Sequence, residues 1–477
     1  MKRVFVILLS FYFLSPLLFY AQEQEINYAH TLTTLLLQNR CIEARELYMQ
    51  HSDEVIQHAK KIIKNSIVIE WFYKSQIAWY FNKPDTAISY LENLLSNHDY
   101  QLQLGTLTGI LYAKLLRQYT DKQQFNAAIK LSNEFIDYYK RNPFKLDQEL
   151  IKNELIFIEN LKSSLEDRAQ KEPIIKVERI NSHKDSVIKL LESNFIRFNA
   201  KYNDVQIETW FDTGKDYYFF ISKSLADKIG VKVFINNENS AYFVNDVKLQ
   251  VYEGVIDSVD FQSLKMYNIP VLVYYDKYGM SIIESIFDED STKLERIYTD
   301  KQISMGMAAI KLIEKIEFDW SQNSISFPDD GEAKIDNSVS NIFFIYNKLF
   351  IYSIINGFNF SGNLDTGRND FINISTSFYE NNKSDFEVDS IIKRKPLNIS
   401  SSSTWGGTVA SIQHKYAKNA NVFFNSTSIA HDIKEVAITD ISTYFESLDG
   451  NYGVRFLKRL APRVIIDLVN MEIELKN

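Results

Sequence analysis

At residues 208–222 the chain carries the segment ETWFDTGKDYYFFIS, which contains Asp212-Thr213-Gly214. The same tripeptide returns as Asp365-Thr366-Gly367 within SGNLDTGRNDFINIS, residues 361–375. One copy would mean little, because a given tripeptide occurs by chance in roughly one sequence of this length in a few tens. Two copies in similar surroundings predict one carboxylate from each half of a duplicated domain, brought face to face as a catalytic pair.

The surroundings of the two motifs repeat as well. A glycine after a bulky residue lies 94 residues after the first motif Asp and 88 residues after the second, at Gly306 and Gly453. Each glycine opens a short helical segment, and the strand that follows contains Asp319 or Asp467, 13 or 14 residues after the glycine. Apolar runs around a polar turn precede each motif and predict a β-hairpin that delivers the motif loop. This shared order indicates an ancient duplication.

These residues resemble the retropepsin-like and pepsin-like aspartyl proteases. In each lobe of that family a hairpin leads to a hydrophobic-hydrophobic-Asp-Thr-Gly loop, and a hydrophobic-hydrophobic-Gly loop crosses beneath it. Trp210–Gly214 and Met305-Gly306 match this pattern in the first half. Leu364–Gly367 and Tyr452-Gly453 match it in the second half, with Asn363 where a second apolar residue is usual.

The resemblance covers roughly residues 190–477 and implies an endopeptidase with Asp212 and Asp365 as catalytic residues. Two carboxylates about 3 Å apart cannot both ionise cheaply, so they share one proton and act as base and acid on a water molecule. The implied substrate is a peptide or protein, no cofactor is expected, and one chain supplies the whole site. The threonines would brace the opposite lobe, and the implied loop support comes from Thr213, Gly214, Thr366, Gly367, Gly306 and Gly453.

Two residues depart from the family pattern. Lys215 and Arg368 follow the motif glycines, where active members carry Ala, Ser or Thr. A nearby cation favours the ionised carboxylate and works against a shared proton, unless these long side chains point away to solvent. Two functions therefore stay open: an exported endopeptidase, or an inactive protein of protease fold that binds peptides or partner proteins through its cleft or helical domain.

Two segments are candidates for flaps over the substrate. Residues 236–254 contain Tyr242, and residues 398–413 contain Trp405 beside Gly406-Gly407. The paired glycines suit a mobile tip, and the aromatic side chains suit contact with a substrate. The alternative for Tyr242 and Trp405 is ordinary strand packing.

Composition limits the other functions. The formal net charge of -8 is spread without long runs and predicts no nucleic-acid partner. The single cysteine, Cys41, and the seven scattered histidines lack metal-ligand spacing, so no metal site is expected. His414 and His431 have no partners at metal spacing, and the acidic run at 287–292 lacks the glycine and spacing of a calcium loop.

Residues 1–21 predict a secretory signal peptide. They combine two early cations, a long apolar run and the small residue Ala21 before polar residues. An uncleaved membrane anchor is the alternative, because the run is almost long enough to span a bilayer, but Ser10 and Pro16 within it favour cleavage. We therefore expect a periplasmic or secreted protein without a membrane anchor after cleavage.

Residues 22–167 show helical periodicity, most clearly at 86–97 and 125–141. An alanine recurs after a short polar turn at spacings of 43 and 41 residues, at Ala44, Ala87 and Ala128. This repeat resembles degenerate tetratricopeptide repeats, whose concave face would bind a peptide or a partner protein. An irregular helical bundle that acts as a spacer is the alternative.

The predicted architecture is a multidomain α+β protein. An N-terminal α-helical, repeat-like domain precedes a mainly β, bilobal, aspartyl-protease-like domain. The expected parts are a signal peptide at 1–21, the helical domain at 22–167, a polar linker at 168–188, and two lobes at 189–334 and 335–477.

Overall fold

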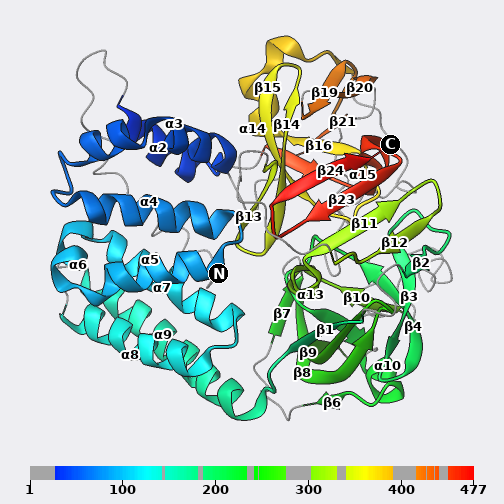
Figure 1. Cartoon of the computed structure of the whole chain (residues 1–477), viewed down its shortest axis with the longest axis horizontal. Coiled ribbons are helices and arrows are strands. Elements are labelled where there is room, and N and C mark those ends of the chain that lie inside the picture. The colour runs from blue at the N-terminus through cyan, green and yellow to red at the C-terminus, as the bar shows by residue number, and fades with distance from the viewer. Residues whose placement is uncertain are drawn as a thin grey trace. The chain divides into compact units, whose positions relative to one another are not determined.

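The computed structural model shows a multidomain α+β protein, in which a helical unit precedes a β-rich unit (Figure 1). The helical unit extends to Glu172, and the β-rich unit begins at Pro173. This confirms the fold class expected from the sequence. The structure describes residues 27–141, 146–180, 186–233, 241–244, 247–274, 302–329, 340–389, 415–425, 427–433, 436–439 and 449–476.

Helices fill the described part of the first unit. Two of them, α5 and α8, cover the segments that showed the clearest helical periodicity. Pro84 lies in the first turn of α5, where its missing N–H costs no hydrogen bond. The bounds are α2 Tyr28–Leu37, α3 Cys41–Ala59, α4 Ser66–Tyr80, α5 Pro84–Ser96, α6 His98–Leu104, α7 Leu107–Asp121, α8 Phe125–Arg141 and α9 Gln148–Lys171.

Three turns between these helices share one backbone feature. Asn39, Asn82 and Gln123 adopt positive φ values of 57°, 52° and 53°. Each lies five residues before an alanine that is 0% exposed, at Ala44, Ala87 or Ala128. A small side chain at a helix interface lets neighbouring helices approach closely. The sequence repeat therefore returns in the structure as the same turn followed by the same tightly packed alanine.

The first half of the β-rich unit is built on one sheet of nine strands within the described residues. The strand order is β1-β9-β5-β10-β4-β3-β8-β6, and β7 pairs with β8. The bounds are β1 Lys176–Arg179, β3 Arg197–Tyr202, β4 Val205–Phe211, β5 Phe219–Ser222, β6 Lys232–Val233, β7 Ala241–Val244, β8 Val247–Asp260, β9 Leu264–Tyr274 and β10 Gln302–Met305.

The second half is built on a sheet of ten strands within the described residues. The strand order is β17-β18-β21-β16-β22-β15-β14-β19-β20, and β13 pairs with β14. The bounds are β13 Ile342–Ile345, β14 Lys348–Ile355, β15 Phe358–Leu364, β16 Ile372–Ser375, β17 Val388–Asp389, β18 Lys415–Ala417, β19 Ala420–Phe424, β20 Thr427–Ile433, β21 Val436–Thr439 and β22 Gly450–Tyr452. A short 3₁₀ helix, η4, covers Lys383–Asp385.

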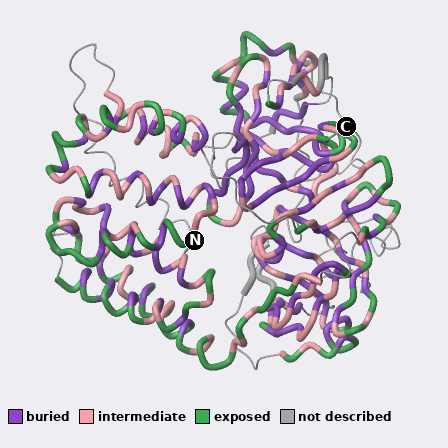
Figure 2. The backbone as a smooth tube through the Cα atoms, in the orientation of Figure 1, coloured by how far each residue is buried: buried purple, intermediate pink, exposed green. Residues whose placement is uncertain are grey.

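The two sheets have the same local topology around the motifs. β4 ends directly before Asp212 and pairs in parallel with β10, and β15 ends directly before Asp365 and pairs in parallel with β22. β10 and β22 then pair antiparallel with the strands that follow the motif loops, β5 and β16. Every residue of β5 and β16 is buried, and Figure 2 shows buried backbone along the strands of both halves. Each motif loop therefore begins and ends in a buried strand.

A serine ends the strand after each motif and begins a short helix. Ser222 Oγ accepts the Leu225 N–H at 3.3 Å, and Ser375 Oγ accepts the Phe378 N–H at 3.0 Å. Both serines lie ten residues after the motif Asp. The duplication therefore extends to the side chains that cap these helices. The two helices are α10 Lys223–Lys228 and α14 Thr376–Asn381.

A third sheet joins the two halves, with the strand order β2-β12-β11-β23-β24. Its centre is the antiparallel pair of β11 from the first half and β23 from the second. Because β24 pairs with β23, the last strand of the chain belongs to this joint sheet. The bounds are β2 Val187–Lys189, β11 Lys315–Asp319, β12 Ser324–Ser326, β23 Arg463–Asp467 and β24 Glu472–Lys476.

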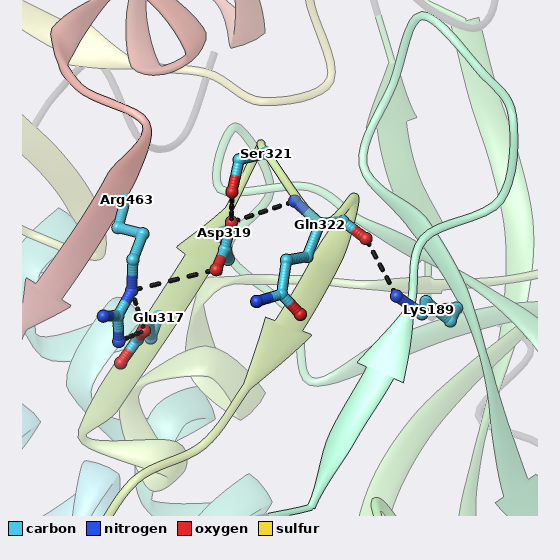
Figure 3. Close-up of polar contacts among 6 residues, drawn as sticks. All are labelled: Lys189, Glu317, Asp319, Ser321, Gln322 and Arg463. Carbon is cyan, nitrogen blue, oxygen red and sulfur yellow. Dashed lines mark hydrogen bonds and ion pairs between the residues drawn. The ribbon is translucent and has the colours of Figure 1, made fainter. Parts of the chain in front are cut away.

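Ion pairs cross the joint at both ends of the β11–β23 pair. Lys315 Nζ lies 3.2 Å from Asp467 Oδ2. At the other end Arg463 Nε lies 2.8 Å from Glu317 Oε1 and 3.8 Å from Asp319 Oδ2 (Figure 3). The two strands therefore carry a cation at the start and an aspartate at the end, related by the pseudo-twofold of the duplication.

Asp319 and Asp467, the aspartates that repeat in the sequence, also hold the turns into the final strands. The Ser321 hydroxyl donates to Asp319 Oδ1 at 2.6 Å, as Figure 3 shows. The N–H groups of Val469 and Asn470 donate to Asp467 Oδ1 at 3.0 and 2.8 Å. Their recurrence is explained by structure and requires no role in chemistry.

The stretch expected as a linker, 168–188, contains ordered elements at both ends. It includes the last turn of α9, strand β1 and the start of β2. β1 pairs with β9, and β2 pairs with β12, so backbone pairing holds this polar segment where composition alone suggested a loop. Within the described ranges, we find no helix with the length and apolar character needed to cross a membrane.

Candidate active site

The two Asp-Thr-Gly loops are tied to each other through their threonines. The Thr213 N–H donates to Thr366 Oγ1, and the Thr366 N–H donates to Thr213 Oγ1, each at 3.0 Å. The hydroxyl of Thr213 donates to the Leu364 carbonyl at 2.7 Å, and that of Thr366 donates to the Phe211 carbonyl at 2.8 Å. Both threonines are 0% exposed, so water does not compete for these bonds. Each loop is thus held by the other half of the molecule.

Each motif glycine lies between the two aspartates. The Gly214 N–H donates to Asp212 Oδ1 at 2.9 Å, and the Gly367 N–H donates to Asp365 Oδ1 at 3.0 Å. A Cβ added to Gly214 would lie 2.1 Å from Asp365 Oδ1, and a Cβ added to Gly367 would lie 2.6 Å from Asp212 Oδ1. No side chain fits at either position. Each carboxylate therefore lies against the loop that carries the other.

The carboxyl of Asp212 sits in an environment that favours its protonated form. Its side chain is buried, with 2% of the residue exposed. The pKa of Asp212 is raised to about 7, first by burial and next by the Asp365 carboxylate. Lys215, Lys348 and the Gly214 N–H lower this pKa and offset part of the rise. A proton therefore stays at Asp212 from acid pH to near neutrality, because burial and the Asp365 charge both disfavour the ionised carboxylate.

The segments that contain Gly306 and Gly453 hold the motif loops through backbone hydrogen bonds. The Met305 carbonyl accepts the Asp212 N–H at 2.9 Å, and the Tyr452 carbonyl accepts the Asp365 N–H at 2.9 Å. These carbonyls directly precede Gly306 and Gly453. The backbone N–H of each motif aspartate is therefore held by the carbonyl of the residue before the repeated glycine.

Gly306 and Gly453 themselves allow the close approach of a second backbone segment. A Cβ on Gly306 would lie 2.4 Å from the Tyr217 carbonyl oxygen, and a Cβ on Gly453 would lie 2.4 Å from the Asp370 carbonyl oxygen. After each glycine a short helix begins. Its first N–H donates to the carbonyl of the residue that follows the motif glycine: Met307 N–H to Lys215 at 2.7 Å, and Val454 N–H to Arg368 at 2.9 Å. The helices are α13 Met307–Ile313 and α15 Val454–Leu460.

The two cations after the motif glycines have different surroundings. Arg368 engages Asp370 in its own loop, with Nη2 at 2.7 Å and Nε at 3.0 Å from Asp370 Oδ2. The Arg368 side chain is 18% exposed, so it does not point freely into solvent. Lys215 is half-buried, and its charge lowers the pKa of Asp212. Arg368 is thus paired with Asp370 and also interacts electrostatically with Asp365, and Lys215 lowers the pKa of Asp212.

Lys348 is a further cation at this site, and it lies in no sequence motif. It begins β14, and its ammonium group donates to the Gly214 carbonyl across the two halves. Burial lowers the pKa of Lys348, while Asp216, Asp365 and Asp212 act in the opposite direction. A lysine of the second half is therefore part of the electrostatic environment of both carboxylates.

The side chains beside the motifs differ between the halves. Trp210, two residues before Asp212, lies with its ring centre 5.4 Å from that of Phe195. Asn363, two residues before Asp365, is 9% exposed, and its amide donates to Asn451 Oδ1 at 3.4 Å. An amide that pairs with the neighbouring strand thus lies where the resemblance predicted an apolar residue. Two residues before the motif aspartate, the first half thus has an aromatic pair and the second half an amide pair.

The candidate flap residues are less fully described. Tyr242 lies on β7 and pairs with Leu249 on β8 in a hairpin, and its side chain lies outside the described part of the structure. Trp405 and Gly406-Gly407 lie outside the described residues, as do His414 and the acidic run at 287–292. Among the described residues no group of three or more His, Cys, Asp and Glu side chains is placed to hold a metal ion.

Some solved structures match this chain. No family model and no curated protein matches the sequence. The crystal structure of a retropepsin-like aspartic protease from Rickettsia conorii aligns with 29% of this chain and 81% of its own chain, at 18% identity and a TM-score of 0.18.

Proposed function

We propose that this chain is an aspartic endopeptidase that hydrolyses peptide bonds with Asp212 and Asp365 as its catalytic pair. The observation that carries the proposal is the reciprocal hydrogen bonding of Thr213 and Thr366, which holds each carboxylate against the glycine of the opposite motif. One chain supplies both carboxylates, so the site is complete without a second copy.

The chemistry follows from a pair that holds one proton. The ionised carboxylate accepts a proton from a bound water molecule as that water attacks the peptide carbonyl. The protonated carboxylate then supplies the proton that the leaving nitrogen needs. The raised pKa of Asp212, about 7, supports this role because it keeps the single-proton form available at acid to near-neutral pH. Which of the two holds the proton is a property of the pair.

The test is cleavage of casein and of a peptide library by the mature chain between about pH 3 and pH 8. We expect the wild-type protein to cut, and Asp212→Asn and Asp365→Asn each to lose activity by about a thousandfold or more, because no second carboxylate remains to share the proton. Asp319→Asn is the matched control, since this aspartate holds a turn in the joint sheet. Equal cleavage by wild type and Asp212→Asn, or no cleavage by either at any pH, rejects the proposal.

A second function keeps the fold without the chemistry. Lys215 and Lys348 both lower the pKa of Asp212, and this favours the doubly ionised pair, which has no proton to supply to the leaving nitrogen. In that case the chain is a peptide-binding protein. We then expect the wild-type protein and Asp212→Asn to bind library peptides with the same affinity, and neither protein to cleave them.

For the helical unit we propose a tetratricopeptide-like scaffold that binds a protein partner or substrate. The support is the repeated left-handed turn five residues before a fully buried alanine. For residues 1–21 we propose a signal peptide that exports the mature chain to the periplasm or beyond. N-terminal sequencing of the protein recovered from cell fractions tests the export, and an intact Met1 on all recovered protein contradicts it.

A further inference from the structure

Lys348 reaches the first motif loop from the second half. The residue begins β14, at the end of the hairpin that leads to Asp365, and its ammonium group donates to the Gly214 carbonyl. The N–H of the same glycine donates to Asp212 Oδ1 at 2.9 Å. A side chain of one half thus fixes the residue that orients the carboxylate of the other.

This contact breaks the symmetry of the duplication. In both halves the residue two before the motif Asp pairs with a residue of the preceding strand, Arg197 in the first half and Phe350 in the second. Two residues before these lie Phe195 and Lys348. The equivalent of Lys348 is therefore an aromatic residue that packs near Trp210, with ring centres 5.4 Å apart. Lys348 therefore has no cationic counterpart at the equivalent position of the first half.

We propose that Lys348 is a positioning residue of the catalytic pair: it fixes the first motif loop through Gly214, and its charge sets the pH range over which the pair holds one proton. The inference rests on the proposed function for its catalytic meaning. The contact of Lys348 with Gly214 and the titration of the two carboxylates can both be examined without peptide cleavage.

The charges around Lys348 give the direction of the effect. Asp216, Asp365, Asp212 and Lys215 all act on it electrostatically, and Asp365 also acts on Arg368, which is engaged with Asp370. A cation near the pair stabilises the ionised carboxylates. Its removal therefore shifts both proton-loss steps of the pair to higher pH, and the activity window moves with them.

The experiment measures the titration of the pair in the full chain, by carbon NMR of protein labelled at aspartate Cγ. The two signals are assigned with Asp212→Asn and Asp365→Asn. We expect Lys348→Met and Lys348→Gln to shift the midpoints upward by about one pH unit or more, with the pH–kcat/KM profile moving in parallel. Lys348→Arg keeps the charge, so its midpoints should stay within a few tenths of a unit of wild type.

Two of these variants separate charge from tethering. Lys348→Gln retains an amide donor without charge, and Lys348→Met retains neither. Lys315→Met is the matched control, because it removes an ion pair between the halves, with Asp467 at 3.2 Å, away from the catalytic pair. It should lower Tm and leave the carboxylate midpoints in place. If Lys348→Met does not fold, Lys348→Gln carries the test.

The outcomes are distinct. Unchanged midpoints in Lys348→Gln, or a shift of the same size in Lys348→Arg, overturn the inference and leave Lys348 a tether between the halves. A wild-type protein that cleaves nothing overturns the proposed function, while the NMR titration still decides whether Lys348 sets the protonation of the pair.

Discussion

Thr213 and Thr366 each donate a backbone N–H to the other's hydroxyl oxygen, both at 3.0 Å, across the two halves of the β-rich unit. Thr213→Val keeps the shape of the side chain but removes the acceptor for Thr366 and the donor to the Leu364 carbonyl. We expect it to lower the free energy of unfolding by about 2–4 kcal/mol, because two buried polar groups lose their partners. Urea unfolding measures this loss.

Thr213→Ser is the matched variant, since serine keeps the hydroxyl and loses only a methyl group. It should retain most of the stability and peptide cleavage that Thr213→Val loses. If Thr213→Val is as stable and active as wild type and Thr213→Ser is not, the methyl packing matters and the hydrogen bonds between the halves do not.

Gly214→Ala should abolish cleavage. The added Cβ would lie 2.1 Å from Asp365 Oδ1, so the opposite carboxylate or the loop must move. Gly357→Ala is the control: Gly357 has φ +87° and no atom within 4 Å of an added Cβ, so that change costs backbone strain of about 1 kcal/mol without touching the site. Peptide cleavage and Tm measured on both variants distinguish them. Full activity in Gly214→Ala contradicts the close approach of the two loops.

Stability should fall as the pH rises from about 4 to about 7, because the folded protein holds a proton on Asp212 that the unfolded chain releases. The folded pKa is raised to about 7 from the ordinary 3.8, so this contribution is fully present below pH 4 and is lost as the pH passes through 7. Asp212→Asn cannot ionise and should remove on the order of 3 kcal/mol of this pH dependence. Urea unfolding at several pH values compares the two proteins; parallel curves contradict the raised pKa.

The two repeated aspartates of the joint sheet should differ in their effect on stability. Asp467 is 1% exposed and accepts hydrogen bonds from Val469 and Asn470, whereas the side chain of Asp319 is 14% exposed. We expect Asp467→Ala to cost about 3 kcal/mol or more and Asp319→Ala about 1 kcal/mol. Thermal unfolding of the pair measures the difference, and equal losses would show that burial does not separate them.

The contribution of Asp467 to stability changes with pH in the opposite direction to that of Asp212. Burial raises the pKa of Asp467, but hydrogen bonds from Asn470 and Lys315 outweigh it and leave the pKa below its ordinary value. Its contribution is therefore present at neutral pH and is lost as the pH falls through the acid range. Asp467→Ala should consequently be closest to wild type in stability at the lowest pH at which both remain folded.

Much of the site could be predicted because its parts are local. Each motif and its glycine recur at similar spacing, and the hairpin turn at Asn203-Asp204 carries positive φ values of 46° and 65°, as a tight turn of this kind requires. The ion pair of Arg368 with Asp370 is equally local, being two residues apart, and could have been found in the sequence.

Lys348 could not be found in this way. Its contact with Gly214 joins residues 134 positions apart, and the residue belongs to a strand whose apolar pattern gives no warning of a half-buried cation. Only the comparison of the two hairpins by their pairing, with Phe195 at the equivalent place, marks it as unusual. The strand β1 was hidden for a related reason: Lys176–Arg179 is polar, and pairing with β9 alone makes it a strand.

The pairing of β11 with β23 also sets when the molecule can be completed during synthesis. The edge of β11 that β23 covers stays open until β23 emerges from the ribosome, more than a hundred residues later. At ordinary elongation rates this interval is on the order of ten seconds. The sheet that joins the two halves therefore cannot form on a nascent chain before β23 has been made.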